Sequence, residues 1–136
     1  MATNNEIGKA IYSILSNDAT VSASVSTRIF PVVAAQDTAF PFVVYTVTNQ
    51  EPTMTKDGVS PLDTISVQID CYALEYDANV TLSNAVRSAL DFYSGTVQSQ
   101  AIQRIRFQGQ NDGEYDEDLG VFWQSLDFDI RLKRQR

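Results

Sequence analysis

The sequence contains no histidine and only one cysteine in 136 residues. Histidine is the commonest general base and metal ligand, and its ordinary pKa is the one nearest neutrality. Its absence therefore removes most familiar catalytic and metal-binding arrangements. The single cysteine, Cys71, excludes an internal disulfide and a zinc site built from several thiolates of one chain. These features indicate a reducing compartment.

Cations, prolines and long apolar runs are also scarce. Ten Lys and Arg residues stand against 17 Asp and Glu residues, which gives a net charge of −7. An acidic domain is a poor candidate for binding nucleic acid or anionic lipid, because both need clustered cations. No apolar run is long enough to span a membrane, and the first residues lack the basic run and apolar core of a signal peptide. We therefore expect no membrane partner.

What remains is the composition of an ordinary globular domain. Hydrophobic residues make up 43% of the chain and charged residues 20%. The length predicts a single domain over residues 1–136, large enough to bury a core without disulfides or metal. The sequence shows no internal repeat and no glycine-rich phosphate loop, and we expect no cofactor.

Helical spacing of apolar residues predicts two main helices. The first carries a stripe from Ile7 to Leu15, and Asp18 can cap a short second turn. The main helix is expected to follow Asp77 as its N-terminal cap and to end with Gly95 as its C-terminal cap. Its predicted buried stripe is Ala78, Leu82, Ala85, Val86, Ala89, Leu90 and Tyr93.

Five segments have the composition or alternation of strands: residues 28–33, 40–48, 64–73, 101–107 and 121–133. Apolar and polar residues alternate most regularly in 64–73 and 121–133. Such alternation is typical of an antiparallel sheet with one solvated face, since buried parallel strands are apolar throughout. We predict an α+β fold with an antiparallel sheet of about four to five strands and two main helices packed on one face.

Residues 49–63 are polar and are interrupted by Pro52, Gly58 and Pro61. A loop of this length within a compact domain is unusual and often functional. Alternatively, Asp57 followed by Gly58 is the signal of a hairpin turn, which would make this segment the tip of a long hairpin.

The segment 111–118 is strongly acidic, with Asp112, Glu114, Asp116, Glu117 and Asp118. A calcium-binding EF-hand loop beginning at Asp112 needs glycine at its sixth position, where this chain has Glu117. A catalytic carboxylate pair needs two different environments, which one exposed loop does not provide. A solvated loop is therefore the favoured interpretation, with no metal site.

Cys71 is a candidate nucleophile. It shares the core face of its predicted strand with Ile69 and has no histidine partner, so a buried thiol is expected. We predict that the chain is not an enzyme.

Basic and aromatic side chains occupy the predicted solvent face of the sheet. Arg104 and Arg106 share a strand face, and Arg131 leads into a basic tail at residues 133–136. Opposite charges at different places on one body favour head-to-tail contacts, which close into rings. Aromatic residues outside a core are enriched at interfaces. The residues predicted to contact a neighbouring subunit are Tyr72, Arg104, Arg106, Trp123 and Arg131. The alternative is a solvated sheet face with a frayed tail.

Six stretches in a fixed order resemble one known family. They are AIYSILSNDA at 10–19, RIFP at 28–31, FPFVVY at 40–45, VQIDCYA at 67–73, AVRSAL at 85–90 and SLDFDI at 125–130. The chain resembles the tail-completion, or tail-terminator, family of long-tailed bacteriophages over nearly its whole length. The family has no catalytic residues to transfer to this sequence.

The resemblance implies a structural role in the virion. Similar proteins form a ring, usually a hexamer, on the end of the tail tube nearest the head. The ring stops tube polymerisation and presents a surface to the head–tail connector, or stopper, protein. Transient passage of DNA through the centre, without specific binding, is also implied. The expected location is the head–tail junction, after assembly in the host cytoplasm.

Two hypotheses about residues follow. Six copies would carry a net charge of −42, six times −7, which suits a conduit that does not retain DNA. The acidic segment is therefore expected to line or rim the bore. The segment 49–63 is expected to contact the tube or the connector, through Thr53, Met54, Thr55, Lys56, Asp57 and Val59.

Two other classes of function are retained as alternatives. A small ligand- or protein-binding module in the cytoplasm would have an apolar cavity between helices and sheet. A hydrolase would use the acidic loop with a divalent metal and would depend on Asp112 or Asp116.

Overall fold

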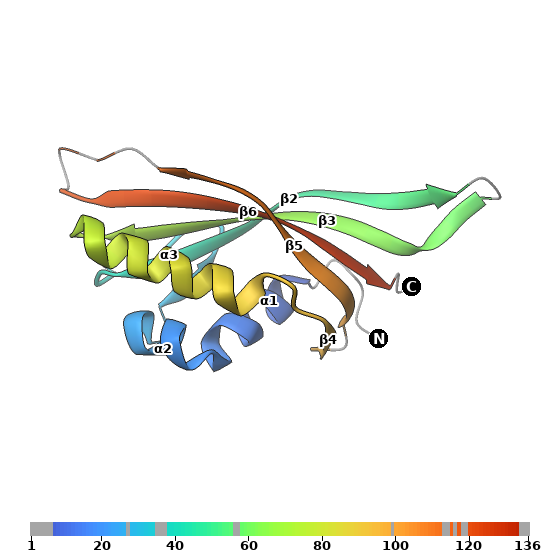
Figure 1. Cartoon of the computed structure of the whole chain (residues 1–136), viewed down its shortest axis with the longest axis horizontal. Coiled ribbons are helices and arrows are strands. Elements are labelled where there is room, and N and C mark those ends of the chain that lie inside the picture. The colour runs from blue at the N-terminus through green and yellow to red at the C-terminus, as the bar shows by residue number, and fades with distance from the viewer. Residues whose placement is uncertain are drawn as a thin grey trace.

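The computed structural model describes residues 7–26, 28–34, 38–55, 58–98, 100–112, 115, 117 and 120–133, with the backbone alone for 49–55, 58–62, 111 and 112. The described helices are α1 (Ile7–Asn17), α2 (Ala19–Val25) and α3 (Tyr76–Leu90). The described strands are β1 (Ile29–Pro31), β2 (Phe42–Thr55), β3 (Gly58–Ala73), β4 (Gly95–Val97), β5 (Gln100–Asp112) and β6 (Phe122–Lys133). The helices lie together on one face of a long, twisted sheet (Figure 1).

The sheet has the strand order β1-β2-β3-β6-β5-β4. Every neighbouring pair is antiparallel except β1 and β2, which run parallel from Ile29↔Val43 to Pro31↔Tyr45. The α+β class predicted from the sequence is confirmed. The count of four to five antiparallel strands is too low, because the described sheet has six strands, including the three-residue β4, and its β1 edge is parallel.

The centre of the sheet is the pair β3 and β6, which matches residue for residue from Leu62↔Lys133 to Ala73↔Phe122. The alternation read from the sequence is confirmed in both strands. Ile65, Val67, Ile69 and Cys71 are at most 1% exposed on the helix side of β3, as are Leu126, Phe128, Ile130 and Leu132 on β6. Burying each such apolar side chain stabilises the fold by about 1.5–3 kcal/mol.

The first two helices follow the sequence prediction. The predicted stripe of α1 is buried, at Ile7, Ala10, Ile11, Ile14 and Leu15. Asp18 caps α2, since its Oδ1 accepts hydrogen bonds from the backbone N–H groups of Thr20 and Val21, both at 3.0 Å. The short second turn is therefore a seven-residue helix, which packs against α1 and α3.

The start of α3 differs from the prediction. The helix begins at Tyr76, with Glu75 at the N-cap position and no side-chain capping bond, so Asp77 lies inside the first turn. There its carboxylate interacts favourably with the helix dipole. Ala78 is exposed rather than buried, and the buried face instead contains Asn79 and Ser83.

The end of α3 also differs. The helix stops at Leu90, and Gly95 belongs to β4, so Gly95 is not its C-terminal cap. Two backbone hydrogen bonds to β5 set this end: Phe92 N–H donates to the Ile105 carbonyl at 2.9 Å, and Ile105 N–H donates to the Tyr93 carbonyl at 3.0 Å. Pairing with the sheet edge, rather than a glycine, terminates the helix.

Residues 49–55 and 58–63 form strand rather than a loop. Backbone pairing between β2 and β3 continues from Asn49↔Ser66 to Thr55↔Gly58, which confirms the long-hairpin alternative. The hairpin extends well past the helices (Figure 1). Pro52 and Pro61 lie where their strands pair on one side only among the described residues, and such positions tolerate a missing N–H.

Candidate interaction surfaces

The sheet face opposite the helices, called the outer face below, carries three kinds of side chain in sequence along β3 and β6. Its aromatic end contains Tyr72 and Trp123, paired across the two strands. Its middle is polar, and its other end is basic around Arg131. The two ends of the outer face can therefore make chemically different contacts.

The aromatic end is a row of rings that crosses four strands. The Phe42 ring stacks on Tyr72 with centroids 4.9 Å apart, and Tyr72 stacks on Trp123 at 5.9 Å with an interplanar angle of 8°. Phe30 and Phe40 add edge and tilted contacts to Phe42. The sequence predicts Tyr72 and Trp123 to be exposed aromatic residues that contact a neighbouring subunit. In the structure both side chains are half-buried, stacked against each other. Burial and the nearby Asp70 raise the pKa of Tyr72.

The polar middle is held by hydrogen bonds between β3 and β6 and by one within β3. The Asp70 carboxylate accepts from Ser125 Oγ at 2.6 Å and from Gln68 Nε2 at 2.9 Å. The Asp129 carboxylate accepts from Ser66 Oγ at 2.9 Å. These hydrogen bonds hold the polar side chains of the outer face in defined positions.

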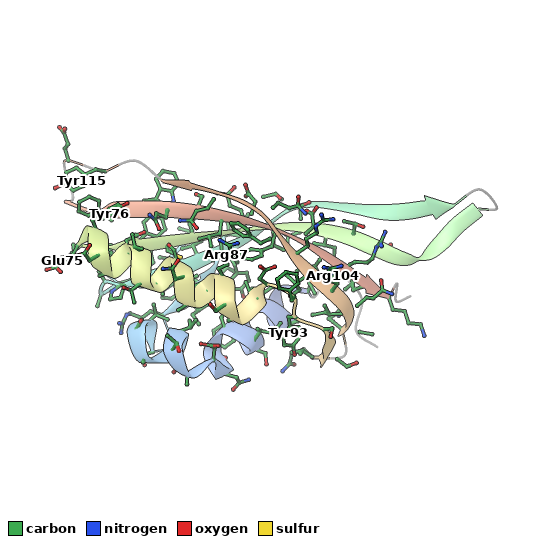
Figure 2. All side chains as sticks on the ribbon, in the orientation of Figure 1. Glu75, Tyr76, Arg87, Tyr93, Arg104 and Tyr115 are labelled. Atoms are coloured by element: carbon green, nitrogen blue, oxygen red, sulfur yellow. The ribbon has the colours of Figure 1, made fainter. Side chains whose placement is uncertain are left out.

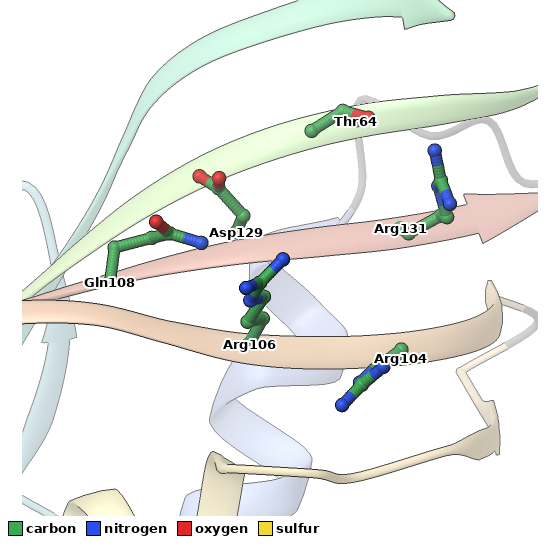
Figure 3. A pocket seen from close by; sticks show the side chains of 6 residues that line it. All are labelled: Thr64, Arg104, Arg106, Gln108, Asp129 and Arg131. Atoms are coloured by element: carbon green, nitrogen blue, oxygen red, sulfur yellow. The ribbon is translucent and has the colours of Figure 1, made fainter.

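The basic end is a shallow pocket of about 220 Å³ lined by Thr64, Arg104, Arg106, Gln108, Asp129 and Arg131 (Figure 3). The structure therefore brings together the three arginines predicted from the sequence. Arg104 is directly opposite Arg131 across β5 and β6, and Arg106 is opposite Asp129. In Figure 3 the Arg106 guanidinium points towards β6, whereas that of Arg104 turns away and lies 5.6 Å from the Phe92 ring centroid.

Exposed apolar side chains gather at the end of the sheet where α3 begins. Leu74 is 56% exposed, and Tyr76 and Tyr115 are each 50% exposed. Both tyrosines contact the Phe122 ring, with centroids 5.8 Å and 4.7 Å away. Figure 2 places Tyr76 and Tyr115 together at this end, far from Arg104. Clustered exposed aromatics of this kind mark contact surfaces.

The acidic segment and the hairpin tip are described only in part. Asp112 is the last described residue of β5, paired with Gln124, and Glu117 is exposed. Glu114, Asp116 and Asp118 lie outside the described residues, as do Lys56 and Asp57 of the predicted tube contact. Thr53, Met54 and Thr55 lie in β2 and Val59 lies in β3, so these four belong to the paired part of the hairpin. Of the basic tail, Lys133 ends β6 and is exposed.

The described part of the chain has neither a metal-ligand cluster nor a membrane-spanning helix. No group of three potential metal ligands comes together there. No helix among those described is long and apolar enough to cross a membrane. Between the helices and the sheet, where a binding module would hold its ligand, Leu82, Val86 and Phe128 are at most 1% exposed and pack together.

Cys71 is a buried thiol, as predicted. It is fully buried beneath α3, and burial raises its pKa from 9.0 to about 12. A hydrogen bond with Ser83 opposes this rise, and the charge of Asp70 adds to it. A thiol that keeps its proton at neutral pH is a poor nucleophile.

Sequence reasoning missed a buried polar cluster under the N-terminal half of α3. Asn79 Nδ2 donates to the carbonyls of Cys71 and Phe122, each at 2.9 Å, and Ser83 Oγ donates to Gln124 Oε1 at 2.6 Å. Asn79 and Ser83 stand at helical spacing with Leu82 and Val86. This helical spacing indicates that Asn79 and Ser83 are buried, whereas the polarity of their side chains indicates exposure to solvent.

The chain was compared with known proteins. A family model described as tail completion protein gp17 matches residues 9–133. A solved chain from the virion of a native gene transfer agent particle is similar with a TM-score of 0.81 and 18% sequence identity, covering 97% of this chain and 98% of that one. A second solved chain is similar with a TM-score of 0.59 and 12% identity, covering 100% and 99%. These two similarities concern the fold.

No curated protein sequence matches the chain. The family model leaves out only the first eight and the last three residues. The family expected from the six ordered stretches is the one that matches. This chain belongs to the tail completion protein gp17 family, structural proteins of the bacteriophage virion tail.

Proposed function

We propose that this protein assembles as a ring of six copies on the head-proximal end of the tail tube. The ring stops tube polymerisation, joins the tail to the head–tail connector and lets DNA pass through its centre. Family membership and the similar chain in a virion particle support a position in the tail. The head–tail junction as its place, and assembly in the host cytoplasm, are parts of the same proposal.

The observation that carries the proposal is the β2–β3 hairpin. Its strands pair with each other as far as Thr55↔Gly58, whereas β6 joins β3 only from Leu62 and β1 accompanies β2 only as far as Tyr45. A two-stranded ribbon is marginally stable alone, and its free edges offer backbone groups for pairing with another chain. Such a projection is suited to docking on the tube or the connector.

The opposite end of the molecule offers a different surface. The apolar cluster of Leu74, Tyr76 and Tyr115 lies where α3 begins, at the far end of the sheet from the hairpin (Figures 1 and 2). A protein that joins two different partners needs two unlike surfaces. A subunit whose two ends differ in this way can also end a polymer, since its exposed end does not repeat the site on which it docked.

The first test is the particle mass in solution, measured by light scattering with and without purified tail tubes. We expect a mass near six subunits, or rings seen by electron microscopy on tube ends. A protein that stays monomeric and ignores tubes would refute the proposal and return the chain to the binding-module class.

The second test shortens the hairpin within its register. Replacing residues 53–62 by Asn-Gly keeps Pro52↔Asp63 as the last pair and closes it with a two-residue turn. We expect folded protein but tails that do not join heads. The matched control replaces Asn84 and Ser88, which are exposed on α3, by Ala and should preserve joining. Infectious particles from the shortened chain would reduce the hairpin to a spacer.

A further inference from the structure

In the arginine pocket at the basic end of the outer face, positive side chains outnumber negative ones. Arg104, Arg106 and Arg131 are exposed, and Asp129 is the single carboxylate in the lining. Among the described residues none forms an ion pair with these arginines, and the Asp129 carboxylate is instead bonded to Ser66. The pocket is therefore open to an anion from outside.

The geometry of the pocket favours a carboxylate ligand. Arg104 and Arg131 are directly opposed across β5 and β6, an arrangement of like charges that destabilises a strand pair. An anion bound in the pocket lowers the repulsion among these like charges. Guanidinium groups present a planar fork of donors, which matches the two oxygens of a carboxylate.

The sequence holds a concentrated source of carboxylates in residues 112–118, where five acidic residues lie within seven positions. These acids cannot reach the pocket of their own chain. From Arg104↔Arg131 to Asp112↔Gln124 the two strands run for eight residues of β5, or about 26 Å at about 3.3 Å per residue. Tyr115, in the middle of residues 112–118, contacts the Phe122 ring, at the end of β6 that lies far from Arg104 (Figure 2).

We propose that the pocket formed by Arg104, Arg106 and Arg131 receives the acidic segment 112–118 of a second copy of this chain. The acidic segment follows one end of the β5–β6 pair and the arginine pocket lies at the other end, so the contact is head-to-tail. Head-to-tail contacts generate closed rings when the rotation closes. The net charge of −7 disfavours the other polyanion at hand, the phosphates of DNA.

This inference rests on the proposed ring and assigns the acidic segment a contact between subunits. The expectation that the segment lines the bore predicts a different result. Neutralising a bore lining would slow DNA passage and leave assembly intact, whereas neutralising a contact prevents assembly.

The test uses a charge-matched set of variants. R106Q/R131Q lowers the net charge by two inside the pocket, and N84E/S88E lowers it by two at exposed positions on α3. We expect the pocket variant to weaken association about tenfold at 0.15 M salt, measured by light scattering with tail tubes present. The α3 variant should assemble as the parent protein does. Circular dichroism confirms that both are folded.

A charge exchange then identifies the occupant. R106E/R131E and E114K/D116K should each fail to assemble with themselves. Mixing the two should restore rings in which the variants alternate, because both contacts between unlike variants then pair opposite charges. Combining all four changes in one chain should also restore rings. Restoration cannot arise from misfolding. Failure of the combined variant to form rings overturns the proposal of a second copy as occupant.

Other outcomes are also decisive. If R106Q/R131Q assembles normally but slows DNA ejection, the pocket meets DNA and the inference is wrong. If the parent protein itself ignores tubes and stays monomeric, the proposed function fails first, which distinguishes the two failures.

Discussion

Asn79 provides the most direct test of how α3 is attached to the sheet. This side chain is fully buried, and its Nδ2 bridges two carbonyls on different strands, Cys71 of β3 and Phe122 of β6, at 2.9 Å each. Both bonds lie beneath the first turns of α3. Replacing Asn79 by Ala removes both of them at once.

The magnitude follows from three contributions. Each lost hydrogen bond costs about 1 kcal/mol, and the space left by the amide costs about 1 kcal/mol more. Against this, Asn79 Oδ1 is itself buried without a hydrogen-bond partner among the described residues, and its removal returns about 1 kcal/mol. The net expectation for Asn79→Ala is a loss of about 2 kcal/mol in the free energy of unfolding.

The assay is urea unfolding followed by circular dichroism, which gives the midpoint and its slope. The matched control is Asn84→Ala, an exposed asparagine on the same helix, with an expected change within about 0.5 kcal/mol. If Asn79→Ala costs no more than Asn84→Ala, the two bonds do not hold the helix and the reasoning is wrong.

A second variant sharpens the result. Asn79→Asp keeps the size but directs carboxylate oxygens at two carbonyls, so it should cost more than Asn79→Ala at pH 7. Burial raises the pKa of such a carboxyl above its unfolded value, and the protonated form can donate to one carbonyl. The variant should therefore approach Asn79→Ala in stability as the pH falls towards 4, and a pH-independent deficit would contradict this account.

Three further outcomes are expected. Asp18→Ala removes the cap of α2 and should lower stability by about 1 kcal/mol in thermal melts, with Asp18→Ser restoring most of it. Leu126→Ala should cost about 2–5 kcal/mol in urea unfolding, since the side chain is fully buried. Cys71 should resist thiol reagents at pH 8 until the protein unfolds. Folding raises the pKa of Cys71 from 9.0 to about 12. The contribution of this thiol to the free energy of unfolding is therefore complete below pH 9, and about 4 kcal/mol of stability is lost as the pH rises to 12. Cys71→Ala should therefore show a shallower alkaline decline, and an equal decline would contradict the assignment.

The central strands could be predicted from the sequence because burial on one face forces strict alternation. Both β3 and β6 have the faces that their patterns indicated, Cys71 included. The parallel direction of β1 could not be predicted, since three residues from Ile29 to Pro31 pair through the tertiary fold and carry no directional signal.

The misplaced boundaries of α3 have a similar origin. Glycine is the usual residue at a helix C-terminus, but here pairing of Phe92 with β5 ends the helix, and Phe92 takes the left-handed conformation with φ of 64°. At the other end, Asn79 and Ser83 are buried because strand carbonyls and Gln124 bond to them. Such partners are distant in sequence, so no local pattern reveals them.

The arginine residues of the candidate site were identified from sequence, yet the pocket was not. A register shift between Ile102 and Arg104 places Arg104 opposite Arg131 on the outer face. Bulges of this kind depend on the partner strand. The aromatic row was found only in part for the same reason, because Phe42 joins Tyr72 and Trp123 through cross-strand register.

The uninterrupted pairing of β3 with β6 has a mechanical consequence. Their hydrogen bonds run across the strands, from Leu62↔Lys133 to Ala73↔Phe122. A pull along the strands loads all of these bonds together, so the pair resists shear as one unit. The three-residue edges β1 and β4 would instead peel bond by bond. Force transmitted between the two ends of this subunit would thus be carried by the central pair β3 and β6, whereas the short edge strands β1 and β4 would separate first.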